Sequence, residues 1–174
     1  HHISEITVQE GSKRYIYGLP VYELAQKSVT MSVYQKLPNG KGQIIFDPIN
    51  NSLNNTAGKD GLFQRETIDP FPHSFLLTAI LSPDYSDITG NGISDDDLGT
   101  AIKFNYSRSN YKLIGTENSW KNMNWRMPAD AGINKANYNR GIVTDDRDDK
   151  ATYSAGKKEL WYVHSIESKN MVTK

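Results

Sequence analysis

Residues 28–34 alternate polar and apolar side chains without a break, and this alternation limits what the chain can fold into. Positions 29, 31 and 33 are valine or methionine, while the positions between them are serine or threonine. Successive side chains of a strand point to opposite faces, so the pattern predicts a strand with one buried and one wet face. A turn signal follows at 38–40, and 43–46 is the expected return strand. Such a pair is typical of antiparallel sheets.

Other segments carry strand signals along most of the chain. They lie at 5–8, 14–17, 73–81, 100–106, 111–114 and 158–167. Roughly eight strands, with turn residues at a spacing of roughly 8–12, are typical of β sandwiches and barrels. The sequence therefore predicts a mainly β fold: an antiparallel, sandwich-like or β-rich segment with long loops and little helix. One short helix is expected around 129–137.

The 174 residues suffice for one domain with a core of its own. We expect residues 1–174 to form a single β-rich domain or a segment of a larger protein, with both ends lying inside a longer polypeptide. Residues 50–60 are rich in Asn, Ser, Thr and Gly and predict a mobile loop, because few apolar groups offset the entropy of ordering it. Periodicity is lost at 115–150, which we expect to be irregular.

The charge and cysteine content exclude several kinds of protein. Twenty basic and 20 acidic residues give a formal net charge of zero, so no overall field favours nucleic acid. The chain has no cysteine, which removes disulfide bonds and thiol catalysis. Its longest apolar run, at 75–81, is far shorter than the roughly 20 residues that cross a bilayer. We therefore expect neither a nucleic-acid partner nor a membrane span.

Residues 87–97 carry the pattern of ligands that a hard cation requires. Oxygen-bearing groups stand at the first, third, fifth, seventh and ninth places of a loop: Asp87, Thr89, Asn91, Ile93 (through its carbonyl) and Asp95. Gly92 occupies the sixth place, where the backbone of such loops bends sharply. The spacing predicts a structural calcium site that joins two strands.

Two departures distinguish this loop from an EF-hand. Thr89 stands where aspartate or asparagine is commoner, and Leu98 occupies the twelfth place, which normally holds a bidentate glutamate. The loop is closer to shorter Asp-x-x-x-Asn-Gly-x-x-Asp loops of extracellular proteins, and Asp96 or Asp97 is a candidate for a further ligand. Few charged ligands imply an affinity of order 10⁻⁴–10⁻³ M. The alternative is a metal-free turn with hydrated carboxylates.

No motif in the chain predicts catalysis. It contains no Gly-x-Ser-x-Gly elbow, no phosphate-binding glycine loop and no zinc-binding histidine spacing. His164 alternates with apolar residues, which favours a packed or half-buried side chain. The acidic cluster at 145–149 lacks a glycine and is typical of a solvated loop, with a second cation site as the alternative. Paired carboxylates for glycoside hydrolysis remain open, since their spacing is spatial.

Aromatic residues outside the clear strands offer a different hypothesis. Six of them, several beside Asn or Asp, are Tyr22, Tyr85, Tyr111, Trp120, Trp125 and Tyr138. Exposed rings of this kind suit stacking against sugars, with nearby amides and carboxylates as hydrogen-bond partners. The competing explanation is that they cover strand ends or neighbouring domains. A carbohydrate-binding or carbohydrate-cleaving module is thus the alternative function.

Segments at 14–22, 81–85, 87–99, 103–106 and 158–167 share one further property. Together they resemble an internal part of very large Rhs-like (YD-repeat-related) surface proteins of gliding Gram-negative bacteria. The resemblance implies export through the type IX pathway and a location in the medium or on the cell surface. It also implies that the partners are other domains of the same polypeptide, with secretion machinery and surface glycans as further candidates. The leading hypothesis is a non-enzymatic β-rich segment of such a protein with a structural calcium loop.

Overall fold

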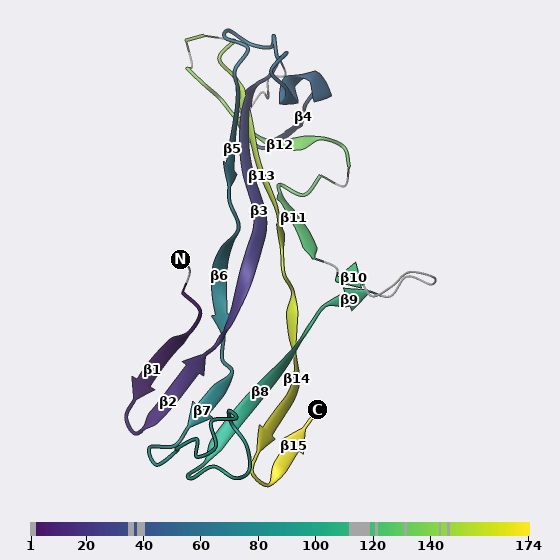
Figure 1. The fold of residues 1–174 in the computed structure, drawn as a ribbon. Helices are drawn as coiled ribbons and strands as arrows, with labels where there is room; N and C mark the ends of the chain where they lie inside the picture. Colours follow the sequence, from purple (N-terminus) through teal and green to yellow (C-terminus); the bar gives the residue numbers. More distant parts are fainter. Residues whose placement is uncertain are drawn as a thin grey trace. The chain divides into compact units, whose positions relative to one another are not determined.

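The computed structural model describes the whole chain except residues 1–2, 35–36, 38–40, 112–118, 121, 131, 143 and 146. Strands hold 54% of the residues and helix 3%, so the predicted mainly β, antiparallel fold with little helix is confirmed. Two larger antiparallel sheets and one two-stranded sheet are present in the described part (Figure 1). None of its helices is long and apolar enough to cross a membrane.

The first sheet has six strands in the order β1-β2-β7-β8-β14-β15. The strands are β1 (Ile6–Glu10), β2 (Lys13–Tyr17), β7 (Ala79–Leu81), β8 (Ala101–Arg108), β14 (Trp161–Ser168) and β15 (Met171–Thr173). The register places Tyr15 opposite Ile80 and Ile80 opposite Ile102. Between Val163 and Ser165 the pairing of β14 with β8 shifts by a bulge.

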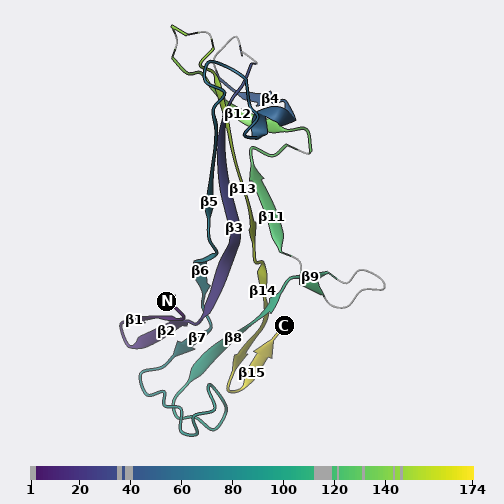
Figure 2. The same ribbon diagram turned by 45° about the horizontal axis from the view of Figure 1, so that its top comes forward.

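The second sheet has seven strands, five of them in the order β4-β12-β13-β3-β5, while β11 pairs with β13 and β6 with β3. The strands are β3 (Leu19–Ser32), β4 (Gln43–Ile45), β5 (Phe63–Ile68), β6 (Phe71–Leu76), β11 (Met123–Met127), β12 (Lys135–Asn139) and β13 (Lys150–Lys158). The long strands β3 and β13 lie side by side in both ribbon views (Figures 1 and 2). β9 (Asn110–Tyr111) and β10 (Ser119–Trp120) form a separate pair, and η1 (Pro48–Asn51) is a short 3₁₀ helix.

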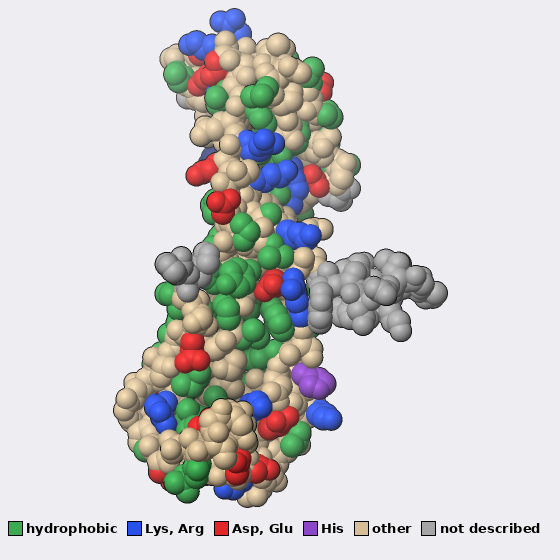
Figure 3. Space-filling view, viewed as in Figure 1, with side chains coloured by type: hydrophobic (Ala, Val, Ile, Leu, Met, Phe, Trp, Pro, Cys, Tyr) green, Lys and Arg blue, Asp and Glu red, His purple; other side chains and the backbone are tan. Residues whose placement is uncertain are grey.

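The chain divides into two compact units. Unit 1 comprises His1–Glu23, Phe71–Met123 and Lys158–Lys174, and unit 2 comprises Leu24–Pro70 and Asn124–Lys157. Whether residues 1–174 fold as one domain stays a prediction. On the face shown in Figure 3, positive and negative side chains are interspersed with each other and with apolar ones.

The main core lies in unit 2 and is built around the alternating segment at 28–34. Val29, Met31 and Val33 have exposed fractions of 1%, 0% and 2%, so the predicted buried face is confirmed. The predicted wet face is wrong at Ser32, which is also fully buried, because its hydroxyl hydrogen-bonds Asp60. They pack with buried residues of β4, β12, β13 and the turn after β4: Ile44, Phe46, Ala136, Tyr138, Ala151 and Tyr153. Phe46 and Tyr153 stack with ring centroids 6.0 Å apart.

The polar loop at 50–60 is organised by one buried asparagine. The Asn55 side-chain nitrogen donates to the carbonyls of Ser32 (3.0 Å) and Leu62 (2.8 Å). Its oxygen accepts from the Asn50 side chain and the Ala57 amide, both at 2.9 Å. An amide side chain thus supplies the order that apolar residues would otherwise give. The mobility expected for this loop stays a prediction.

Several local expectations differ from the structure. The segment at 43–46 does not return alongside 28–34, because β4 pairs with β12 while β3 pairs with β5 and β6. The strand expected at 73–81 is divided between β6 and β7, which belong to different sheets.

The helix predicted around 129–137 is wrong: Ile133 N–H donates to the Asp130 carbonyl at 2.9 Å in a turn, and β12 then begins at Lys135. Asn134 has φ +55°, which breaks a right-handed helix. Within the region expected to be irregular, 115–150, the structure also places β11. Residue 131 and several others of this region lie outside the described residues.

Candidate metal site

The acidic segment forms a closed loop between β7 and β8, in unit 1. Ser86 and Leu98 form a two-way backbone bridge, with N···O distances of 3.2 and 3.1 Å. Below it, Ser82 N–H donates to the Thr100 carbonyl at 2.9 Å, and Thr100 N–H donates to Ser82 Oγ at 2.8 Å. These contacts hold both ends of the loop at the sheet, so the predicted position between two strands is confirmed.

Asp97 anchors the loop from inside. Its exposed fraction is 5%, and its carboxylate accepts from the Tyr85 hydroxyl (2.7 Å) and from the amides of Ser94 (3.0 Å) and Ile88 (3.4 Å). The Tyr85 hydrogen bond, followed by the Ser94 amide, holds the pKa of Asp97 below its usual value. Burial, followed by the same hydrogen bond, raises the pKa of Tyr85 to about 12. Asp97 is therefore charged and engaged within the loop.

The Asp87 carboxylate faces two backbone amides on the exposed side of the loop. Oδ1 accepts from Gly90 N–H at 2.6 Å and Oδ2 from Gly92 N–H at 3.0 Å. Both glycines have positive φ, +72° and +86°, a conformation that favours glycine and that turns their amides toward Asp87. Each Asp87 oxygen keeps a second lone pair, so a cation ligand is still possible at this position.

Three polar side chains, those of Thr89, Asn91 and Ser94, gather around the Asp96 carboxylate. Ser94 Oγ hydrogen-bonds Asp96 Oδ1 and lies 3.0 Å from Asn91 Oδ1. The Ser94 contact, with smaller contributions from Thr89 and Asn91, lowers the pKa of the Asp96 carboxyl. Hydroxyl, amide and carboxylate oxygens close to one another are the donor set that a calcium ion takes. The sequence indicated Asp96 or Asp97 as a candidate for a further ligand, but Ser94 was missed. Ser94 is the eighth residue of the loop, whereas the predicted ligands are at its odd-numbered places.

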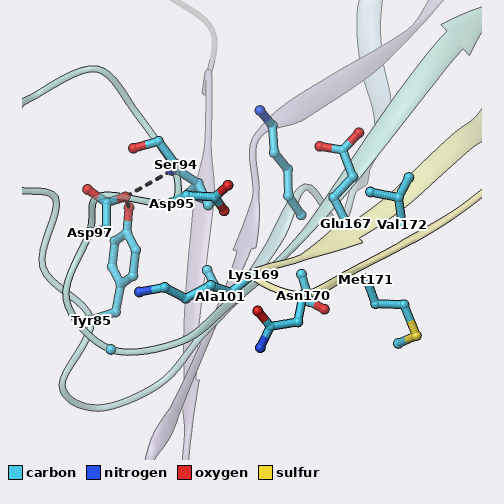
Figure 4. A pocket seen from close by; sticks show the side chains of 14 residues that line it. Tyr85, Ser94, Asp95, Asp97, Ala101, Glu167, Lys169, Asn170, Met171 and Val172 are labelled. Atoms are coloured by element: carbon cyan, nitrogen blue, oxygen red, sulfur yellow. Dashed lines mark hydrogen bonds between the residues drawn. The ribbon is translucent and has the colours of Figure 1, made fainter.

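The five predicted ligands do not share one hollow of the surface. Asp87, Asn91 and Ile93 line a hollow of about 580 Å³ beside β7 and β8. Asp95 lines a different pocket of about 610 Å³, which Ile93 also borders. Figure 4 shows the Asp95 carboxylate in this second pocket, away from Tyr85 and Asp97. Of the predicted ligands, Thr89 and Asn91 lie toward Asp96. The full set of five ligands stays a prediction.

The pocket that Asp95 lines also carries charges of both signs. Lys103 comes from β8. Figure 4 shows Glu167, from β14, and Lys169, from the turn before β15. Mixed charges at an open pocket give no clear preference for an anion or a cation. Among the described residues, no group of three or more His, Asp or Glu side chains could hold a metal ion. A cation at 87–97 would therefore depend on hydroxyl, amide and carbonyl oxygens beside its carboxylates.

A serine and a lysine also meet in unit 2, but in a form unsuited to nucleophilic catalysis. Lys150 Nζ lies 3.1 Å from Ser32 Oγ, 2.9 Å from Asp60 Oδ1 and 3.3 Å from Asp148 Oδ1. Burial lowers the pKa of Lys150, but Asp60 and Asp148 outweigh burial and raise it, so the amine is no base. Ser32 has an exposed fraction of 0%. The cluster therefore stabilises the fold.

The second acidic segment, at 145–149, is also built into the fold. Asp145 pairs with Lys59 at 3.0 Å, and Asp148 accepts from the Ile142 amide at 2.7 Å. Asp149 is buried, with an exposed fraction of 4%. A loop of fully solvated carboxylates was expected there, but these carboxylates have partners inside the chain. Residue 146 lies outside the described residues.

Comparison with known proteins gives no relative: no family model, no curated protein and no solved structure matches the chain. The resemblance to Rhs-like surface proteins, drawn from short segments, therefore stays a prediction. Function has to be argued from the geometry of the loop and of the surrounding units.

Proposed function

We propose that the chain is a non-enzymatic, β-rich segment of a large secreted or cell-surface protein, and that its loop at 87–97 binds calcium. The observation that carries the calcium proposal is the gathering of oxygens from Thr89, Asn91, Ser94 and Asp96. Hydrogen bonds hold these groups together in the metal-free chain, and a calcium ion would take the place of the shared protons. Calcium would neutralise the acidic loop and hold β7 and β8 together at this end of the sheet.

The non-enzymatic part of the proposal is supported by the hydrogen bonds of side chains that could otherwise take part in catalysis. The buried Ser32 hydroxyl and the Lys150 amine are held in an ion-pair cluster with Asp60. Tyr85 and Asp97 serve as the internal anchor of the loop. A secreted or cell-surface setting fits an extracellular-type calcium affinity of order 10⁻⁴–10⁻³ M, because calcium is abundant outside cells. The partners proposed are other domains of the same polypeptide.

Isothermal titration calorimetry with calcium tests this function. The expected result is one site of about millimolar affinity. Asp96→Asn and Asp87→Asn should each weaken binding by about tenfold or more, since each removes one of few charged ligands. Asp69→Asn, which neutralises an exposed carboxylate of unit 2, is the matched control and should bind as the unaltered chain does. Absence of heat above the dilution blank in the unaltered chain would remove the calcium site.

A hollow in unit 2 supports carbohydrate binding as a second candidate. Its volume is about 710 Å³; Trp125, Ile68 and Pro70 line it together with the amide side chains of Gln26 and Asn124. An indole surrounded by amides suits a sugar ring, which stacks its C–H face and hydrogen-bonds its hydroxyls. A glycan array with the unaltered chain and with Trp125→Ala tests this second function. Absence of binding by the unaltered chain to any glycan would rule it out.

A further inference from the structure

The loop carries an Asn-Gly pair at an exposed position. Asn91 and Gly92 are both exposed, and no atom beyond the adjacent residues lies within 4 Å of where a Gly92 Cβ would stand. Asparagine followed by glycine is the pair most prone to spontaneous deamidation, because no side chain hinders attack by the next backbone nitrogen. We propose that Asn91 is a deamidation site and that Asp87 and Ser94 assist the reaction.

The reaction needs no cofactor and balances as follows. Gly92 N attacks Asn91 Cγ and loses its proton, water returns a proton to the side-chain nitrogen, and the bond from Cγ to that nitrogen breaks with release of ammonia. The product is a five-membered succinimide that includes the Gly92 nitrogen. Water then opens this ring at either carbonyl, giving aspartate or isoaspartate at position 91. The net change replaces a neutral amide by a carboxylate.

The structure places one group at each end of the reacting pair. Asp87 Oδ2 lies 3.0 Å from Gly92 N and accepts its hydrogen, so this carboxylate is positioned to take the proton as the nitrogen attacks. Ser94 Oγ lies 3.0 Å from Asn91 Oδ1, the oxygen on which negative charge develops. The Ser94 hydroxyl has one proton, which it shares between Asn91 and Asp96. A base, a nucleophile, an electrophile and a donor thus lie within eight consecutive residues, 87–94.

Deamidation would change the loop that we propose for calcium. Position 91 is the fifth place of that loop, and a carboxylate there adds a charged ligand where the amide is neutral. The aspartate product is expected to bind calcium more tightly than the original chain. This consequence rests on the proposed function, whereas the deamidation itself does not.

The test follows residue 91 by peptide mapping and mass spectrometry during incubation of the full chain in chelator at neutral pH. The expected rate in the folded chain exceeds that of the same chain unfolded in guanidinium. Ser94→Ala and Asp87→Asn should each slow the folded chain by about tenfold, less than the ~10²-fold typical of an enclosed acid–base group. The other Asn-Gly pair, at 39–40, is the internal reference and should be unaffected by either substitution.

Two results would overturn the proposal: slower reaction in the folded than in the unfolded chain, or an unchanged rate in both variants. A separate arm adds calcium. Protection of Asn91 is expected there, because a bound cation would hold the amide oxygen away from the attacking geometry. Deamidation without calcium protection would contradict the calcium loop and leave the deamidation intact, so the two failures are distinguishable.

Discussion

Asn55 makes four side-chain hydrogen bonds, which use both donors and both acceptor positions of its amide. The composition of 50–60 predicted only mobility, because a low apolar content indicates that little apolar surface can be buried. A loop can also be ordered by the hydrogen bonds of a buried amide, which composition does not reveal. Asparagine at an exposed turn and asparagine at a buried one are indistinguishable in sequence. The fully bonded Asn55 is therefore a residue whose role only the structure reveals.

Asn55→Ala is expected to destabilise the chain by about 3 kcal/mol, since it leaves the Ser32 and Leu62 carbonyls without this partner in a buried setting. Urea denaturation followed by tryptophan fluorescence measures the change. Asn54→Ala, at the neighbouring exposed position, is the control and should cost less than about 0.5 kcal/mol. Equal stability of the two variants would contradict the role given to Asn55.

Asp60 predicts a specific dependence of stability on pH. The Ser32 hydrogen bond, followed by that of Lys150, lowers the pKa of Asp60 from 3.8 to about 2. A carboxyl whose pKa is lower in the folded state stabilises the fold above its unfolded pKa, and this contribution is lost as pH falls through the folded value. Asp60→Asn should therefore be less stable than the unaltered chain at pH 5, and the difference should shrink between pH 4 and 2.

The side chain of Asp60 is half exposed, so solvent screening keeps the effect modest. Denaturation curves at a series of acidic pH values give the comparison. A difference that stays constant over this range would show that Asp60 acts through packing and not through its charge.

At the scale of elements, the alternation of polar and apolar residues predicted the strands well. It predicted poorly where strands are interrupted by bulges and how the loops are anchored. The buried face of β3 followed directly from residues 28–34, because period-two patterning and burial have the same cause. His164 was expected to be packed, yet it is exposed. The bulge between Val163 and Ser165 shifts the register there, and a bulge leaves no mark in the hydrophobic pattern. The loop at 87–97 was located correctly, but its anchor, Asp97, was seen only as a spare ligand.

Gly99 is expected to be essential to the closure of that loop. Its φ is +78°, and an added Cβ would lie 2.7 Å from Tyr85 Cα and Tyr85 N. Gly99→Ala therefore combines an unfavourable conformation with a backbone clash and should cost more than about 2 kcal/mol. Gly90→Ala is the matched control: its φ is +72°, but nothing lies within 4 Å, so only the conformational cost of about 1 kcal/mol applies. Thermal unfolding compares the two, and equal losses would contradict the clash.

At the scale of the whole molecule, the chain consists of two compact β units, each with its own use of polar side chains. Unit 2 contains the apolar core together with the hydrogen-bonded cluster of Ser32, Asp60 and Lys150. Unit 1 contains the six-stranded sheet and the acidic loop. The alternation of polar and apolar residues predicted the fold class. It did not predict the division into two units, because each unit is assembled from segments that are distant in sequence.

The melting temperature with calcium and with chelator tests the central claim most directly. At calcium about tenfold above its dissociation constant, mass action adds about 1.4 kcal/mol, which raises the midpoint by roughly 3–6 °C for a chain of this size. At the same calcium concentration, a tenfold loss of affinity in Asp96→Asn should cut the rise to about a third, and Asp69→Asn should keep it in full. An identical midpoint in calcium and in chelator would contradict a structural calcium ion at 87–97.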